Sequence, residues 1–178
     1  MAEELTARTG RHQQRYDNEY RLVAGCIPYR YKESGEACNG TVNRELEVLM
    51  VLSRGGTALI FPKGGWENDE SLQEAACRET FEEAGVRGII KKDLGCWDFR
   101  SKRYQDDSNL EGFHRAHMFA LLVTEQLDSW PEQNERQRKW VTITEADGRC
   151  KDDWMRQALR SCVTYLSSRQ MENVASYI

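Results

Sequence analysis

The chain has 178 residues, of which 39% are hydrophobic and 30% are charged, and its formal net charge is −4. This length supports one domain with a sizeable core and is too short for two. The acidic balance excludes a general affinity for nucleic acid or for anionic membranes. The longest apolar run, residues 118–123, is far too short to span a bilayer, so no membrane partner is expected.

The sequence divides into three expected parts: a flexible N-terminal arm (1–18), a single domain (19–169) and a C-terminal tail (170–178). The arm contains arginines beside early acidic residues, and it lacks the apolar stretch of a secretory signal. Acidic residues also argue against a typical transit peptide. The expected location is therefore the cytoplasm or the nucleus. A mitochondrial address is left open but finds no support in this N-terminus.

Apolar residues alternate or cluster in six places that predict strands. In chain order these are residues 21–31, 46–53, 58–61, 96–100, 116–124 and 139–143. Segments 33–43 and 104–112 are loops by composition. A last helix is expected over residues 152–168, because apolar residues recur there at helical spacing. They are Met155, Ala158, Leu159, Cys162, Val163 and Leu166.

Another helix is predicted over residues 71–84, after a strand and a glycine-containing loop. Ser71 and Glu74 form a capping pair at its start, and Gly85 is a suitable left-handed cap at its end. Small residues at spacings of three and four give this helix one face that packs on a sheet. They are Leu72, Ala75, Ala76, Thr80 and Ala84.

Three glutamates occupy the other face of this helix. Glu79, Glu82 and Glu83 stand at i, i+3 and i+4, so their Cβ atoms are expected within about 6 Å of one another. Carboxylates this close raise one another's pKa values unless a cation neutralises them. Most glutamate runs are a solvated acidic face. Here a pair of glycines precedes the helix and lets the backbone approach a metal or a phosphate, which favours Mg²⁺ or Mn²⁺ clamping a pyrophosphate.

Residues 64–86 read GGWENDESLQEAACRETFEEAGV, which resembles the Nudix hydrolase signature Gx5Ex7REUxEExGU. The matching positions are Gly64, Glu70, Arg78, Glu79, Glu82, Glu83, Gly85 and Val86. One position departs, because Thr80 stands where the signature has a bulky apolar residue. Arg78 is a candidate catalytic residue, since its planar guanidinium is suited to orient a glutamate or to contact phosphate.

The resemblance implies an α/β fold, an α/β/α sandwich around a mixed β-sheet, and hydrolysis of a phosphoanhydride bond with Mg²⁺ or Mn²⁺. It implies that Glu79 and Glu83 are metal ligands, and that Glu82 is a ligand or the base that deprotonates the attacking water. The backbone carbonyl of Lys63 or Gly64 is implied as a further ligand. In this family the base sometimes lies outside the signature, so its assignment stays open.

Over nearly the whole domain, the chain looks like the diphosphoinositol polyphosphate and diadenosine polyphosphate phosphohydrolase branch of the family. The matching stretches are VAGCIPYRY, VLMVLSR, FPKGGWE, HRAHMFALLVTEQLDSWPE and RQRKWVTITEA, and FPKGGWENDE is similar to the plant members. This likeness implies a small-molecule polyphosphate substrate. The candidates to bind it by charge-assisted hydrogen bonds are Arg21, Ser53, Arg54, Lys63, Arg115 and Arg138. Val23 departs from the branch, which has a basic residue there.

Three functions remain open at this point. The first is hydrolysis of diphosphoinositol polyphosphates, with diadenosine polyphosphates as secondary substrates. The second is a pyrophosphatase of ordinary nucleotides such as ADP-ribose, NADH or an mRNA cap. The third is a non-catalytic binding module, which the complete carboxylate set disfavours because a retired site has no need to hold like charges together. No nucleic-acid partner is expected, and the chain is expected to be a monomer.

Overall fold

The computed structural model of the chain describes residues 6–33, 44–53, 56–101 and 112–175. Its elements, in chain order, are β1 (Tyr16–Asp17), β2 (Tyr20–Glu33), β3 (Arg44–Leu52), β4 (Leu59–Ile60), β5 (Lys63–Gly65), α1 (Leu72–Ala84), β6 (Val86–Arg100), β7 (Phe113–Gln126), β8 (Arg138–Thr142), α2 (Ile143–Arg149) and α3 (Asp153–Ala175). Most of the expected loops 33–43 and 104–112, and Arg54 with them, lie outside the described residues.

One mixed sheet organises the fold, with strand order β4-β3-β2-β7-β6. β2 pairs in parallel with β7, whereas its other neighbours are antiparallel. β3 pairs with the second half of β2, and β5 pairs with its first half, where Gly25 lies opposite Lys63 and Val23 opposite Gly65. This pairing fixes the loop before α1 to the centre of the sheet.

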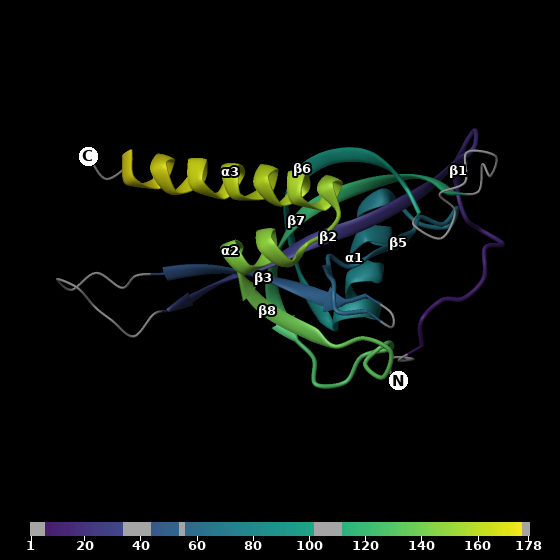
Figure 1. Cartoon of the computed structure of the whole chain (residues 1–178), viewed down its shortest axis with the longest axis horizontal. Helices are drawn as coiled ribbons and strands as arrows, with labels where there is room; N and C mark the ends of the chain where they lie inside the picture. Colours follow the sequence, from purple (N-terminus) through teal and green to yellow (C-terminus); the bar gives the residue numbers. More distant parts are fainter. Residues whose placement is uncertain (1–5, 34–43, 54–55, 102–111, 176–178) are drawn as a thin grey trace.

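Helices cover both faces of this sheet, which makes the predicted α/β/α sandwich (Figure 1). α1 buries Ala75 and Ala76 against Ala24 and Cys26 of β2. On the other face, α2 and α3 close the larger core, because β2 presents alternate side chains to opposite sides. The predicted stripe of α3 lies there, with Met155, Ala158, Leu159, Cys162 and Leu166 buried and Val163 partly buried.

The signature helix forms as predicted. Ser71 is its N-cap, and both halves of the capping box are present: the Glu74 N–H donates to Ser71 Oγ at 3.1 Å, and the Ser71 N–H donates to Glu74 Oε1 at 3.2 Å. Gly85 ends it in the left-handed region with φ 66°. Thr80 is buried on the helix, and its hydroxyl donates to the Ala76 carbonyl at 2.8 Å. The helix therefore accommodates Thr80 at the position where the signature has a bulky apolar residue.

The expected arm is not separate from the domain. Gln14 is buried, β1 pairs with β2, and Gln14 forms a bridge with Glu67 just before α1. The boundary expected at residues 18/19 therefore does not coincide with a change in packing. The tail expected from residue 170 is also too long, because α3 continues to Ala175.

Three further elements differ from the prediction. β6 starts at Val86, directly after Gly85, and is bulged at three places along β7; these irregularities interrupt the alternation that a sequence pattern needs. β5 occupies part of the predicted glycine loop. α2 follows β8 without a gap, because Thr142 ends the strand and caps the helix by accepting from the Glu145 N–H at 3.2 Å.

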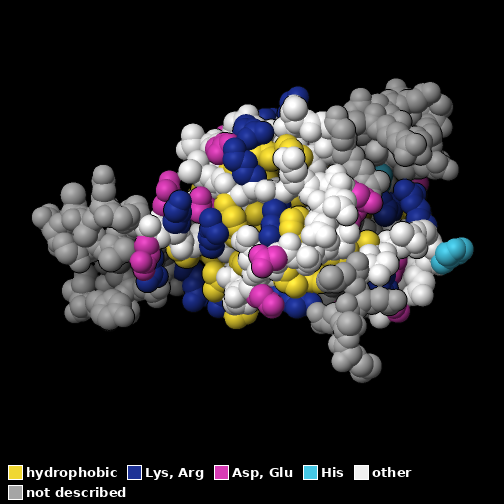
Figure 2. Space-filling view, turned by 90° about the horizontal axis from the view of Figure 1, so that it is seen from below, with side chains coloured by type: hydrophobic (Ala, Val, Ile, Leu, Met, Phe, Trp, Pro, Cys, Tyr) yellow, Lys and Arg dark blue, Asp and Glu magenta, His cyan; other side chains and the backbone are white. Residues whose placement is uncertain are grey.

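The surface is mixed in charge. On the face drawn in Figure 2, Lys and Arg side chains are interspersed with acidic and apolar ones. None of the helices formed by the described residues combines the length and the apolar character needed to cross a membrane.

Candidate active site

The three signature glutamates face the β5–α1 loop, and they are not a solvated surface. Glu82 is 5% exposed and Glu83 6% exposed. Glu79 packs against Gly64 so closely that a Cβ at residue 64 would overlap its carboxylate. Burying three carboxylates on one helix face is unfavourable unless cations or N–H groups compensate them. The structure therefore rejects the solvated-face alternative.

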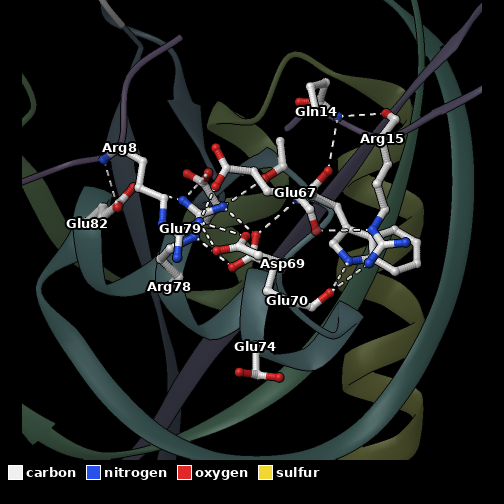
Figure 3. A network of polar contacts seen from close by, with 12 residues as sticks. Arg8, Gln14, Arg15, Glu67, Asp69, Glu70, Glu74, Arg78, Glu79 and Glu82 are labelled. Atoms are coloured by element: carbon white, nitrogen blue, oxygen red, sulfur yellow. Dashed lines mark hydrogen bonds and ion pairs between the residues drawn. The ribbon is translucent and has the colours of Figure 1, made fainter. Parts of the chain in front are cut away.

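Arg78 provides much of this compensation (Figure 3). Its Nε and Nη2 donate to the two oxygens of Glu70 at 2.9 and 2.7 Å, and Nη1 donates to Glu79 Oε1 at 2.9 Å and Glu82 Oε2 at 3.2 Å. Nη2 also donates to the Gly65 carbonyl at 2.8 Å. Since Nε, Nη1 and Nη2 of Arg78 all donate to protein atoms, this residue is placed to orient the glutamates and not to contact phosphate.

Burial raises the pKa of all three glutamates. For Glu79 it raises the pKa to about 8, against the opposing effect of Arg78. Burial also raises the pKa of Glu82 and of Glu83; around Glu83, Arg136 and Lys63 act in the opposite direction. The Lys63 backbone N–H donates to Glu83 Oε2 at 3.2 Å. A further positive charge close to these carboxylates would therefore stabilise their ionised forms.

The oxygen atoms of this site are of the chemical type that binds a hard divalent cation. Carboxylate and carbonyl oxygens are the ligands that Mg²⁺ and Mn²⁺ prefer, and the missing side chain of Gly64 leaves the space in which Glu79 meets the loop backbone. Within the described residues no three acidic, histidine or cysteine side chains already converge as a metal cage. Arg78 and other groups engage the glutamates instead, so binding a metal requires these side chains to turn toward it.

A cavity of about 410 Å³ opens in front of Glu79 and Glu83, and Glu82 is not among the described residues that line it. Glu79 and Glu83 line one side of it, and three cations line it as well: Arg21, Lys63 and Arg136. Arg21 is held by a bond from its Nε to Gln14 Oε1 at 2.9 Å, and burial lowers the pKa of Lys63. Two of the predicted substrate-binding residues, Arg21 and Lys63, are thus brought to the glutamates.

Three other predicted substrate-binding residues do not line this cavity. Arg115 is bound by Asp98 at 2.7 Å and Asp17 at 2.8 Å, because it points to the opposite side of β7 from His114. Arg138 donates to the carbonyls of Ala84 at 3.0 Å and Leu127 at 2.6 Å. The carbonyl of Ser53 accepts from the Gly56 N–H at 3.0 Å.

The sequence interpretation missed two residues that do line the cavity. Arg136 Nη2 lies 3.8 Å from Glu83 Oε1, and its Nε is buried without a hydrogen-bond partner among the described atoms. Glu132 precedes it, and burial together with Glu83 raises the pKa of Glu132 to about 7. Both lie in the irregular segment before β8. Charge alone gives no signal that distinguishes Arg136 from Arg138, two positions further on.

The N-terminal segment also reaches the site. Arg15 donates from Nε to the Glu67 carbonyl at 3.0 Å, and from Nη2 to the carbonyls of Asn68 at 3.0 Å and Glu70 at 3.1 Å. The backbone N–H of Arg8 donates to Glu82 Oε1 at 3.0 Å, and its guanidinium pairs with Asp69 and Glu67 (Figure 3). These contacts join residues more than fifty positions apart, so no local sequence pattern predicts them.

Buried carboxylates that face a cavity lined by cations are the arrangement expected of one class of protein, the hydrolases that act on phosphate with the help of a metal ion. Residues 33–162 match the NUDIX domain family, and the chain therefore belongs to the Nudix family. It is a Nudix hydrolase of phosphoanhydride bonds, a family that generally uses divalent metal ions and small, nucleotide-like substrates.

Two curated proteins and one solved structure are similar to this chain. Nudix hydrolase 16, mitochondrial, of Arabidopsis thaliana is 53% identical over 88% of the chain and 87% of its own length. Diphosphoinositol polyphosphate phosphohydrolase 3-alpha of Mus musculus is 35% identical over 74% of the chain and 70% of its own length. A C. elegans Ap4A hydrolase binary complex superposes with a TM-score of 0.61 at 20% identity, covering 83% of the chain and 98% of that structure. At this identity the third likeness concerns the fold alone.

The expected cytoplasmic or nuclear location is wrong. Five similar Arabidopsis thaliana enzymes, Nudix hydrolases 12, 13, 16, 17 and 18, are 50–53% identical to the chain and carry mitochondrial in their names. These names point to mitochondria.

Proposed function

We propose that this Nudix hydrolase acts on diphosphoinositol polyphosphates, with diadenosine polyphosphates as secondary substrates, and that it uses Mg²⁺ or Mn²⁺. One observation carries the proposal: Arg21, Lys63 and Arg136 share a single cavity with Glu79 and Glu83. Such a cavity suits a substrate with more phosphate groups than a mononucleotide, because each further phosphate oxygen gains a charge-assisted hydrogen bond of about 1.5 to 3 kcal/mol.

The aromatic residues of the cavity support the same choice of substrate. Phe99 stacks on His114 at a centroid distance of 5.0 Å and on Trp154 at 4.8 Å, so its faces are already occupied. It therefore provides no free platform for a nucleobase. Binding that depends on the phosphate chain needs no such platform. The name of the Mus musculus relative, a diphosphoinositol polyphosphate phosphohydrolase, agrees with this preference.

The signature residues receive the following roles. Glu79 and Glu83 would hold the metal together with the backbone carbonyl of Gly64 or Lys63, and Glu82 would act as the base. When bound, the metal neutralises phosphate charge and makes an attacking water more acidic. Arg78 orients the glutamates through its bonds to Glu79 and Glu82.

The proton of the attacking water goes to Glu82. Its carboxylate is buried and is held from both sides, by Arg78 at Oε2 and by the Arg8 N–H at Oε1. Glu132 is the alternative base outside the signature. Glu132 lines the cavity together with Glu79 and Glu83, whereas Glu82 is not among the described residues that line it. The pKa of Glu132, about 7, suits proton transfer near neutral pH.

A substrate panel tests the proposed function. Turnover is measured with Mg²⁺ and with Mn²⁺ on a diphosphoinositol pentakisphosphate, a diadenosine hexaphosphate, ADP-ribose and NADH, with identification of the products. We expect the inositol substrate to have the highest kcat/KM and the diadenosine substrate to follow. If only ADP-ribose or NADH is hydrolysed, the enzyme is an ordinary nucleotide pyrophosphatase and the substrate proposal fails.

Two arginines provide a matched comparison within this panel. Arg21→Gln removes a cation that lines the cavity, whereas Arg115→Gln removes one that lies outside it and is paired with Asp98. We expect Arg21→Gln to raise KM for the inositol substrate at least about tenfold and to affect ADP-ribose less. Arg115→Gln should change neither KM by more than about twofold. Equal losses for both substrates in Arg21→Gln would remove the link between the cationic lining and substrate choice.

We also infer a mitochondrial location from the names of the five Arabidopsis relatives. Immunodetection of the untagged protein in purified mitochondria tests this inference. Recovery of the protein only in the soluble fraction, with mitochondrial markers retained in the organelle, would contradict it.

A further inference from the structure

A second cavity, of about 220 Å³, lies far from the active site. Three tyrosines and three cations line it: Tyr29, Tyr31, Tyr165, Arg44, Lys91 and Arg169. Among the described residues, it shares none of its lining with the active-site cavity, and none of its lining residues is a carboxylate. β2 contributes Arg21 to one cavity and Tyr31 to the other, and ten residues of extended strand separate these positions by roughly 33 Å.

Four elements build this tyrosine–cation pocket. Tyr29 and Tyr31 point to the same side of β2, while Arg44 begins β3 and Lys91 lies in β6. On α3, Tyr165 donates from its hydroxyl to the Lys91 carbonyl at 3.2 Å and accepts from Arg169 Nη1 at 3.1 Å. The α3 side of the pocket is thus joined to β6 by one hydrogen bond, and a second bond within α3 holds the Arg169 guanidinium beside Tyr165.

Several polar groups of the pocket lack a partner. The Tyr29 hydroxyl makes no hydrogen bond to any described residue, and it is not among the fully buried polar atoms that lack a partner, so it is accessible from the pocket. Burial raises the pKa of this hydroxyl, so it remains a neutral donor at physiological pH. Within the described ranges, the side chains of Arg44 and Lys91 also make no hydrogen bond or ion pair, although Glu33 stands opposite Arg44 in the strand register.

We propose that the tyrosine–cation pocket is a second binding site, and that it takes the phosphate group of a small molecule. Arg44, Lys91 and Arg169 come from three different elements and meet three tyrosines at one cavity, so their positive charges act together at one place. A phosphate group offers several acceptor oxygens in a tetrahedral arrangement, so one group can meet donors from β2, β3 and β6 at once. Among the described residues that line the pocket, none is a carboxylate that would compete with this anion.

The test is a titration of the full-length chain in EDTA at low ionic strength, followed by amide shifts in the ¹H–¹⁵N NMR spectrum. One arm adds orthophosphate, and the other adds glycerol 3-phosphate as a phosphate ester. Screening by salt weakens such contacts, which is why the ionic strength is kept low. We expect saturable shifts around Lys91, Tyr165 and Arg44, separate from those at the active-site cavity.

Three variants assign the shifts. Arg44→Gln should weaken binding at the pocket at least about tenfold, and Tyr29→Phe, which removes one hydroxyl and keeps the ring, about threefold. Lys151→Gln is the charge-matched control, because Lys151 is exposed and lines neither cavity. It should leave binding unchanged. Circular dichroism confirms that each variant is folded.

The outcomes are distinct. Saturation with orthophosphate shows that free phosphate suffices, and saturation with the ester alone shows that the site takes a phosphorylated metabolite; either result supports the site. Shifts confined to the active-site cavity, or equal weakening in Lys151→Gln and Arg44→Gln, overturn it. The titration uses neither metal nor turnover, so its result is independent of the proposed reaction.

Discussion

Gly64 shows at the scale of one residue why the signature begins with glycine. A side chain there would overlap the Glu79 carboxylate. We predict that Gly64→Ala raises the dissociation constant for Mg²⁺ at least about tenfold, since displacing one ligand or its support typically costs ten- to a hundredfold. Isothermal titration calorimetry measures this constant.

Gly148→Ala is the matched control for this change. An added Cβ at residue 148 meets nothing within 4 Å, and the residue lies in α2. Metal affinity should therefore stay unchanged, while helix stability should rise by up to about 1 kcal/mol. Unaltered metal affinity in Gly64→Ala would show that Glu79 does not bind the metal from its present position.

The glutamates themselves give the second prediction at this scale. Glu82→Gln and Glu83→Gln should each reduce kcat at least about a hundredfold under saturating Mg²⁺, the usual scale for loss of a base or of a charge-stabilising group. Glu132→Gln discriminates between the two candidate bases. Near-normal rates in Glu82→Gln together with a large loss in Glu132→Gln would move the base outside the signature.

At the scale of an element, Arg138 stabilises the end of α1. Its guanidinium donates to the carbonyls of Ala84 and Gly85, which carry the negative end of the helix dipole, and stacks 3.8 Å from the ring centroid of Trp130. We predict that Arg138→Gln lowers the free energy of unfolding by roughly 1 to 3 kcal/mol. Urea denaturation measures this loss, and KM for the substrate should remain unchanged.

Lys139→Gln is the neighbouring control, because the Lys139 side chain is exposed and pairs only with Glu145 among the described residues. Exposed pairs of this kind contribute about 0 to 1 kcal/mol. A raised KM in Arg138→Gln with unchanged stability would restore the substrate-binding role first expected from the sequence.

The elements also show what a sequence can predict. α1 was predictable to within one residue because its caps and its small-residue face are local patterns. The acidic face was predictable for the same reason. Arg136, Arg15 and Arg8 were not, because their positions depend on chain segments brought together only by the sheet. Arg138 and Arg136 differ in surroundings and not in residue type; the family resemblance favoured Arg138, whereas Arg136 is the one that lines the cavity.

At the scale of the whole molecule, folding brings the carboxylates of Glu79, Glu82 and Glu83 close together, and a bound cation would reduce the repulsion between them. Glu79 has an ordinary pKa of 4.5, which burial raises to about 8 in the folded state. Between these values the folded state binds more protons than the unfolded state, so Glu79 makes the metal-free protein less stable as pH rises. His114 acts in the opposite sense below 6.5, because burial lowers its pKa.

A comparison with Glu79→Gln isolates this effect from that of His114. In EDTA we predict that the variant gains stability relative to the native protein as pH rises from 4.5 to about 8. Mg²⁺ should reverse the order at the upper end of this range by stabilising the native protein. Thermal melts at each pH measure both effects. A constant difference between the two proteins across the range would show that Glu79 is not strained in the absence of metal.

The contact between the Arg8 backbone and Glu82 has a practical consequence for handling this enzyme. We expect a purification tag close to Arg8 to disturb the bond that its backbone makes to the Glu82 carboxylate. A protease cut that removes Arg8 would also leave Glu67 and Asp69 without their arginine. Rates measured on differently tagged preparations would then disagree for a reason unrelated to substrate or metal. A tag at the opposite terminus, beyond α3, avoids this interference.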